Sequence, residues 1–260
     1  MQLTRRPLLL MLLMILGSLP LASCEKTTES GGATKAPEAS VDPSTKSKTD
    51  PHDYVLMKTS MGDIVLQLDP AKAPISVKNF LDYTESGAYD GTIFHRVMNG
   101  FMIQGGGFDV QMKKRPTNAP IKNEWQNGLK NTRGSIAMAR TQAPNSASTQ
   151  FFINVVNNPN LDKPISGGAG YAVFGRVYSG MNVVDSIKAV PVSSRGQMQN
   201  VPTKPVIIEK VTRINKATAD SIKAAPTGAS SKTVPTGTRT TAASPAKTDK
   251  NEDIEPPAFR

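Results

Sequence analysis

The chain has 260 residues, of which 38% are hydrophobic and only 5% are aromatic. These values favour one packed domain flanked by polar segments over a chain that folds throughout. A single Cys excludes an intrachain disulfide, and one Cys with two His excludes a zinc finger, a Cys-ligated cluster and a three-His zinc site. The net charge of +10 is spread along the chain without basic–aromatic interleaving, so nucleic acid is not an expected partner.

Residues 1–23 have the features of a lipoprotein-type signal peptide. Arg5 and Arg6 precede an apolar run (residues 8–16) that is short for a transmembrane helix, and the small residues Ala22 and Ser23 precede Cys24. We therefore predict cleavage before Cys24 and attachment of lipid, palmitate included, to its sulfur. This places the protein in a bacterial cell envelope, anchored to a membrane and facing the periplasm or the exterior. An ordinary cleaved signal with an incidental Cys is the alternative.

Two polar segments flank the predicted domain. Residues 24–52 contain almost no large apolar side chain, and residues 216–260 are rich in Ala, Thr, Ser, Lys and Pro. Because neither composition buries enough surface to offset the entropy of ordering, we predict a flexible tether and a disordered polar tail. Contacts with glycan or cell wall are the alternative role for both. The packed domain is assigned to residues 53–215.

The domain contains many short β-rich runs and two helical stretches. Runs 54–59 and 62–68 around a short turn predict a hairpin. A helix begins at Pro74, with Val77, Phe80, Leu81 and Thr84 on one face, and ends at Gly87; a second fits residues 181–189. Further apolar runs occupy residues 93–97, 101–104, 135–140, 151–156, 171–177 and 206–214. This pattern favours a closed antiparallel barrel with helical caps.

Several chemistries are disfavoured by the motifs. No Gly-x-Ser-x-Gly elbow is present, and His95 in its strand context is more typical of a structural residue than of a general base. The glycines at 105–107 lack the Lys and Ser/Thr of a phosphate-binding loop. Isolated acidic residues argue against a paired-carboxylate glycosidase or a calcium loop.

Three segments carry a specific resemblance. They are residues 94–107 (FHRVMNGFMIQGGG), 136–140 (IAMAR) and 148–153 (STQFFI), and residues 121–124 and 170–175 extend the match. Together they resemble the cyclophilins, which are peptidyl-prolyl cis–trans isomerases, and most of all the bacterial periplasmic members. The resemblance spans residues 54–215. It implies a mainly β fold, a closed eight-stranded antiparallel barrel capped by two α-helices, in a monomer that binds proline-containing polypeptides without metal or cofactor.

The resemblance assigns catalytic roles to Arg96 and Gln104. Rotation about a prolyl amide is slow because C–N resonance sets a barrier of ~20 kcal/mol, and lowering it needs no nucleophile. A donor at the imide nitrogen holds its lone pair out of resonance, and the always-charged guanidinium of Arg96 can supply it. Gln104 is expected to bond the substrate backbone and to orient Arg96. A non-catalytic peptide-binding chaperone or scaffold that uses the same groove is the alternative function.

The resemblance also assigns the substrate-binding residues. Phe101, Met102, Phe152 and Leu161 match the proline pocket, Ala139, Arg140 and Gln150 match the adjoining groove, and Tyr171 stands where many cyclophilins have a pocket His. Asn160 replaces the Trp that contacts cyclosporin in many members, so weak affinity for that drug is expected. Phe151 alternates with Phe152 and is predicted to face the barrel interior.

Overall fold

The computed structural model describes residues 50–225. The predicted signal peptide, Cys24, nearly all of the tether and residues 226–260 of the predicted tail lie outside this range. Within residues 50–225, no helix is both long and apolar enough to cross a membrane.

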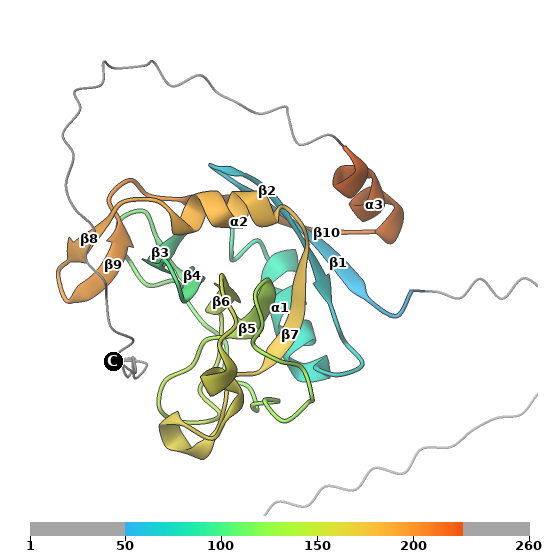
Figure 1. Cartoon of the computed structure of the whole chain (residues 1–260), viewed down its shortest axis with the longest axis horizontal. Helices are drawn as coiled ribbons and strands as arrows, with labels where there is room; N and C mark the ends of the chain where they lie inside the picture. The colour runs from blue at the N-terminus through green and yellow to red at the C-terminus, as the bar shows by residue number, and fades with distance from the viewer. Residues whose placement is uncertain (1–49, 226–260) are drawn as a thin grey trace, which may run out of the picture. The chain divides into compact units, whose positions relative to one another are not determined.

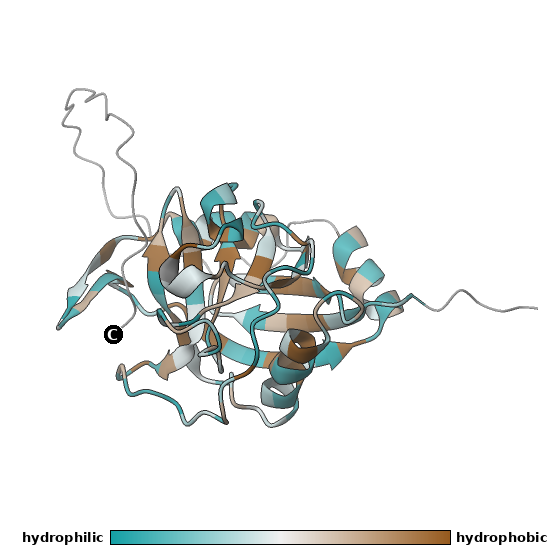
Figure 2. Ribbon diagram, turned by 90° about the horizontal axis from the view of Figure 1, so that it is seen from below, coloured by the Kyte–Doolittle hydropathy of each residue, from teal (hydrophilic) through white to brown (hydrophobic). Residues whose placement is uncertain are grey.

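Eight antiparallel strands close into a barrel, which confirms the predicted fold (Figure 1). Around the barrel the order is β1-β10-β3-β4-β6-β5-β7-β2. The strands are β1 (Asp53–Thr59), β2 (Gly62–Leu68), β3 (Thr92–Met98), β4 (Met102–Asp109), β5 (Ser135–Met138), β6 (Phe151–Asn154), β7 (Val173–Ser179) and β10 (Ile207–Ile214). Hydrophobic and hydrophilic residues alternate along many of them, as side chains that point to opposite faces of a sheet require (Figure 2).

Two helices cover the barrel as expected. Helix α1 (Pro74–Glu85) buries the Phe80 ring against the barrel, where its centroid lies 5.5 Å from that of Phe151. Pro74 occupies the first turn, and the Glu124 carboxylate accepts from the next two backbone N–H groups and from the Ser76 hydroxyl. Helix α2 (Met181–Lys188) buries its apolar face in the same core.

A third helix corrects the predicted domain boundary. Helix α3 (Lys216–Ala224) begins where the disordered tail is predicted, and Asn215 is its N-cap, accepting from the Thr218 N–H at 2.9 Å. Ala219 is fully buried in a cluster with Tyr54 and Val65 on the outside of the barrel. The assignment of residues 216–225 to a disordered tail is therefore wrong, because this segment contributes apolar contacts to the domain.

A small second sheet and two short 3₁₀ helices complete the described structure. Strands β8 (Val192–Arg195) and β9 (Met198–Pro202) form a two-stranded sheet that contacts β3. The 3₁₀ helices η1 (Pro159–Asp162) and η2 (Ser166–Gly168) lie between β6 and β7. The second sheet is not predicted, because β8 is exposed throughout and lacks apolar alternation.

Candidate active site

The β3–β4 hairpin sets the position of the two predicted catalytic residues. Its turn is closed by the Phe101 N–H, which donates to the Met98 carbonyl at 3.0 Å, and Gly100 adopts a φ of +87°. A residue with a side chain is strained at this φ, which explains the glycine. The resulting register places Arg96 directly opposite Gln104, so that both side chains lie on the same face of the sheet.

The row continues across the neighbouring strands. Gln104 pairs with Phe152, Phe152 with Ala137, and Ala137 with Val173. Because neighbours in such a row share one face, Phe152 lies on the outer side of the barrel with the predicted site. Phe151, one residue earlier, is fully buried in the interior core, as predicted.

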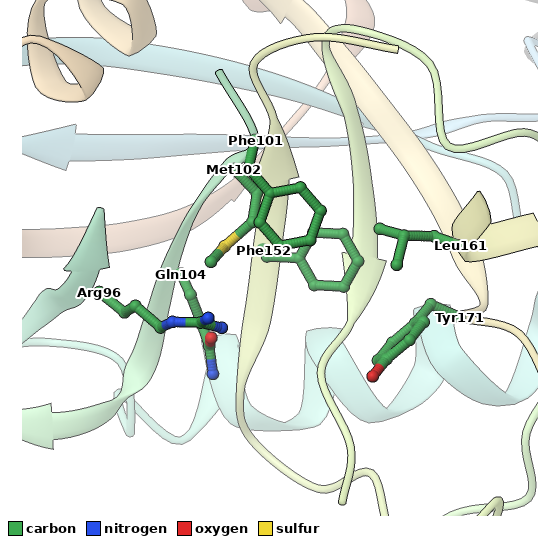
Figure 3. A pocket seen from close by; sticks show the side chains of 7 residues that line it. All are labelled: Arg96, Phe101, Met102, Gln104, Phe152, Leu161 and Tyr171. Atoms are coloured by element: carbon green, nitrogen blue, oxygen red, sulfur yellow. The ribbon is translucent and has the colours of Figure 1, made fainter. Parts of the chain in front are cut away.

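The structure brings seven of the ten predicted catalytic and substrate-binding residues around one pocket (Figure 3). Strands β3, β4 and β6 supply Arg96, Gln104, Met102 and Phe152, and the other lining residues are Phe101, Leu161 and Tyr171. The rings of Phe152 and Tyr171 meet edge to face with centroids 5.7 Å apart. The pocket therefore has an apolar floor and one charged side chain at its edge.

Burial changes the electrostatics of Arg96. Its guanidinium is half-buried, and desolvation lowers its pKa from the ordinary arginine value. Arginine is so basic that the group stays charged at neutral pH. A charged donor next to apolar surface acts with less dielectric screening than one in open water.

A polar network supports Gln104 from behind. Its side-chain N–H donates to Gln150 Oε1 at 2.8 Å, and among the described residues no donor reaches Gln104 Oε1, which is buried. That oxygen therefore has unused acceptor capacity next to the pocket that Gln104 lines. Gln150 therefore supports Gln104 and does not line the pocket. Gly107 is required there, because a Cβ at that position would lie 2.6 Å from Gln150 Cγ.

His95 lies in the barrel wall beneath this network. It is 2% exposed, and its ring centroid lies 4.8 Å from that of Phe108. Burial lowers the pKa of His95 to about 4, so the imidazole is neutral at pH 7. This placement agrees with the structural role that the sequence favours.

Ala139 and Arg140 lie beside the pocket without lining it. Ala139 packs in the same hydrophobic cluster as Phe152. Arg140 is 4% exposed, and its guanidinium donates to the backbone carbonyls of Ala169, Gly170, Thr141 and Gln142. With its donors occupied by the protein, Arg140 is placed to hold the segment before Tyr171 rather than to contact substrate.

Sequence reasoning missed two residues that shape the pocket wall around Tyr171. Asn131 is buried; its N–H donates to Asp162 Oδ1 at 2.8 Å and its side-chain amide to the Tyr171 carbonyl at 3.2 Å. Trp125 packs against Gly170, where a Cβ would lie 2.8 Å from Trp125 Cε3. Neither residue belongs to a motif that names its role. Asn160 is exposed in η1, next to the pocket residue Leu161.

Comparison with known proteins decides the family. Residues 54–213 match the model of the cyclophilin-type peptidyl-prolyl cis-trans isomerases. The chain belongs to the cyclophilin family. It is thereby an isomerase, and the expectation drawn from its three motifs is confirmed.

Individual relatives agree with this cyclophilin assignment. The chain is 59% identical over 162 residues to peptidyl-prolyl cis-trans isomerase B of Escherichia coli, covering 61% of this chain and 98% of that protein. It is 55% identical over 163 residues to peptidyl-prolyl cis-trans isomerase A of Dickeya dadantii, covering 63% and 85%. A Cryptosporidium parvum cyclophilin-type isomerase, crystallised in the presence of the dipeptide Ala-Pro, is 28% identical with a TM-score of 0.52, covering 62% and 99%.

Proposed function

We propose that this cyclophilin accelerates rotation about X–Pro bonds without a covalent intermediate, with Arg96 as the donor to the prolyl nitrogen. One observation supports this most strongly. Arg96 and Gln104 are cross-strand partners at the edge of an apolar pocket lined by Phe101, Met102 and Phe152. A groove that only bound peptides would gain little from a half-buried charge beside the ring-binding surface.

The reaction requires the prolyl nitrogen to lose conjugation with its carbonyl. The proline ring is held in the apolar pocket, and the Gln104 carbonyl oxygen accepts from the substrate backbone. This leaves the Arg96 guanidinium near the nitrogen, where it stabilises the lone pair as the amide twists. A donor whose interaction strengthens during the twist lowers the barrier rather than merely binding the substrate.

We place this activity in a bacterial cell envelope, on proline-containing segments of envelope or secreted proteins. The support is the sequence before Cys24: a basic start, an apolar run and two small residues. Lipid on Cys24 anchors a monomer to the membrane, and a tether of residues 25–52 allows the domain to range roughly 30 Å from it.

Replacement of Arg96 by Ala tests the mechanism. The variant is expected to lose ~10²-fold in kcat/KM, equivalent to about 2.7 kcal/mol of transition-state stabilisation, in a protease-coupled isomerase assay. Arg213→Ala serves as the control, because Arg213 is an exposed arginine on β10 that pairs with Asp53 away from the pocket. Full activity in a folded Arg96→Ala variant refutes the mechanism.

Mass spectrometry of the mature protein tests the anchor. We expect the N-terminal residue to be an acylated Cys24, and Cys24→Ser to release the protein from membranes or to block its maturation. An unmodified N-terminus downstream of Cys24 excludes the anchor while leaving the isomerase mechanism untouched.

A further inference from the structure

A row of polar side chains crosses the outer face of four barrel strands. Tyr54 on β1 pairs with Gln67 on β2, Gln67 pairs with Arg176 on β7, and Arg176 pairs with Ser135 on β5. None of these four residues lines the proline pocket. The row is therefore a separate feature of the barrel wall, which the isomerase mechanism does not use.

Hydrogen bonds along this row orient Arg176. The Tyr54 hydroxyl donates to Asp50 Oδ2 at 2.7 Å and accepts from Gln67 Nε2 at 2.8 Å. Gln67 Oε1 in turn accepts from Arg176 Nε at 2.8 Å. Because Gln67 is 7% exposed and bonded at both ends of its amide, it holds Arg176 by the Nε atom and leaves the two terminal nitrogens of the guanidinium to other partners.

The fixed guanidinium borders a cavity of about 350 Å³. Lys130, His52 and Thr132 also line it, and Asp69 is its one acidic lining residue. Within residues 50–225, neither Arg176 nor Lys130 forms an ion pair. The cavity thus combines two unpaired cations and a hydroxyl donor with a single carboxylate.

We propose that this cavity binds a carboxylate side chain presented by an acidic polypeptide segment. Arg176 and Lys130 match the charge, and the guanidinium can meet a carboxylate through two parallel N–H groups. Asp69 disfavours a compact dianion such as phosphate but can accept from a peptide N–H, and its Oδ1 already accepts from the Lys72 N–H. A peptide that carries Glu or Asp can offer its side-chain carboxylate to Arg176 and Lys130 and a backbone N–H to Asp69.

The apolar residues of the cavity pack in the same hydrophobic cluster as residues of the proline pocket. Leu129 and Val173 line the cavity and also pack in the hydrophobic cluster that contains Phe152 and Tyr171. An acidic segment bound here is therefore held on the same part of the barrel as a proline bound in the pocket. The cavity supplies a second recognition point for polypeptides, separate from the bond that is isomerised.

Binding of a proline-free peptide tests the proposal on the full chain. The probe is the capped peptide acetyl-Gly-Glu-Glu-Gly-amide, with the Gln-Gln counterpart and inorganic phosphate as comparisons, followed by NMR titration. We expect the Glu peptide to shift resonances of residues around Arg176 and to bind about tenfold more tightly than the Gln peptide. No binding of the Glu peptide, or binding by phosphate of equal strength at the same residues, overturns the proposal.

Charge-matched variants separate a built site from general attraction. Arg176→Gln is expected to weaken binding of the Glu peptide about tenfold. Arg176→Lys keeps the charge but loses the planar fork, so an intermediate loss of affinity is expected. Lys58→Gln removes one positive charge from an exposed position on β1 and is expected to leave binding unchanged. Equal losses in Arg176→Gln and Lys58→Gln show non-specific attraction and refute the site. Since the proline-free probe does not require catalysis, failure here leaves the isomerase function standing.

Discussion

The guanidinium carbon of Arg140 lies 4.5 Å from the centre of the Tyr171 ring. The same guanidinium donates to the carbonyls of Ala169 and Gly170, the two residues that precede Tyr171. Arg140 therefore fixes both the main chain and the ring of this pocket residue. A cation over an aromatic face contributes most where both groups are desolvated, and both are buried here.

Loss of Arg140 is expected to loosen the pocket wall rather than to remove a reacting group. We predict that Arg140→Ala raises KM about tenfold for a proline peptide and lowers kcat much less, because the position of Tyr171 relaxes. Arg140→Lys should recover part of the loss through the retained charge. Steady-state measurement of kcat and KM separately decides this. A fall in kcat as large as that of Arg96→Ala, with KM unchanged, contradicts a positioning role.

Asn160 is expected to make the enzyme respond poorly to cyclosporin. The residue is exposed beside Leu161, and its short polar amide offers little of the apolar area that an indole provides. The drug is predicted to bind on the order of 100-fold more weakly than to a member with Trp at this position. Inhibition curves for the wild type and Asn160→Trp should show partial recovery in the variant. Inhibition of the wild type at low nanomolar drug contradicts this prediction.

His95 is expected to make the fold sensitive to mild acid. Its pKa is about 4 in the folded protein and ordinarily 6.5, so the unfolded chain binds a proton first as the pH falls. The contribution of neutral His95 to the free energy of unfolding is therefore full above pH 6.5. It is lost between pH 6.5 and 4, and amounts to about 3 kcal/mol at most. The hydrogen bond from Arg133 lowers the pKa of Asp185 to about 2, so protonation of Asp185 changes the free energy of unfolding only below pH 4.

Urea unfolding at several pH values checks the His95 prediction. His95→Gln should flatten the dependence of unfolding free energy on pH between 6.5 and 4. His52→Gln, a change of the chain's only other histidine, provides the control. An unchanged slope in His95→Gln assigns the acid sensitivity to other groups.

Removal of α3 is expected to destabilise the barrel. A chain ending at residue 215 exposes Tyr54 and Val65, which Ala219 now covers, and should lose about 2 to 4 kcal/mol of unfolding free energy. A chain ending at residue 225 keeps the helix and is the matched control. Chemical denaturation compares the two. Equal stability shows that α3 adds nothing to the fold.

Most of the site could be predicted through the cyclophilin resemblance, because five of the seven lining residues fall in one hairpin and one neighbouring strand. The tight turn at Gly100 fixes the β3–β4 register, and the register alone brings Arg96 opposite Gln104. The alternation of Phe151 and Phe152 likewise follows from strand geometry. These relationships are local, so the motif that contains them carries their geometry.

Other features could not be predicted from the sequence, because they depend on contacts between distant segments. Arg140 meets residues about thirty positions away, and no local pattern shows that its donors are occupied. Helix α3 has a composition typical of disorder, and its Asn215 cap and the spacing of Ala219 and Ile222 are weak signals without the barrel surface that they cover. The tertiary contacts, not helix propensity, make this segment part of the domain.

The contact between Trp125 and Gly170 gives this enzyme a built-in optical reporter. Trp125 is the only tryptophan in the chain, and it lies against the segment that leads into Tyr171. Its fluorescence therefore arises from one known place beside the pocket, with no second indole to obscure it. Entry of a proline peptide can be followed in the unlabelled protein through the emission of this single residue.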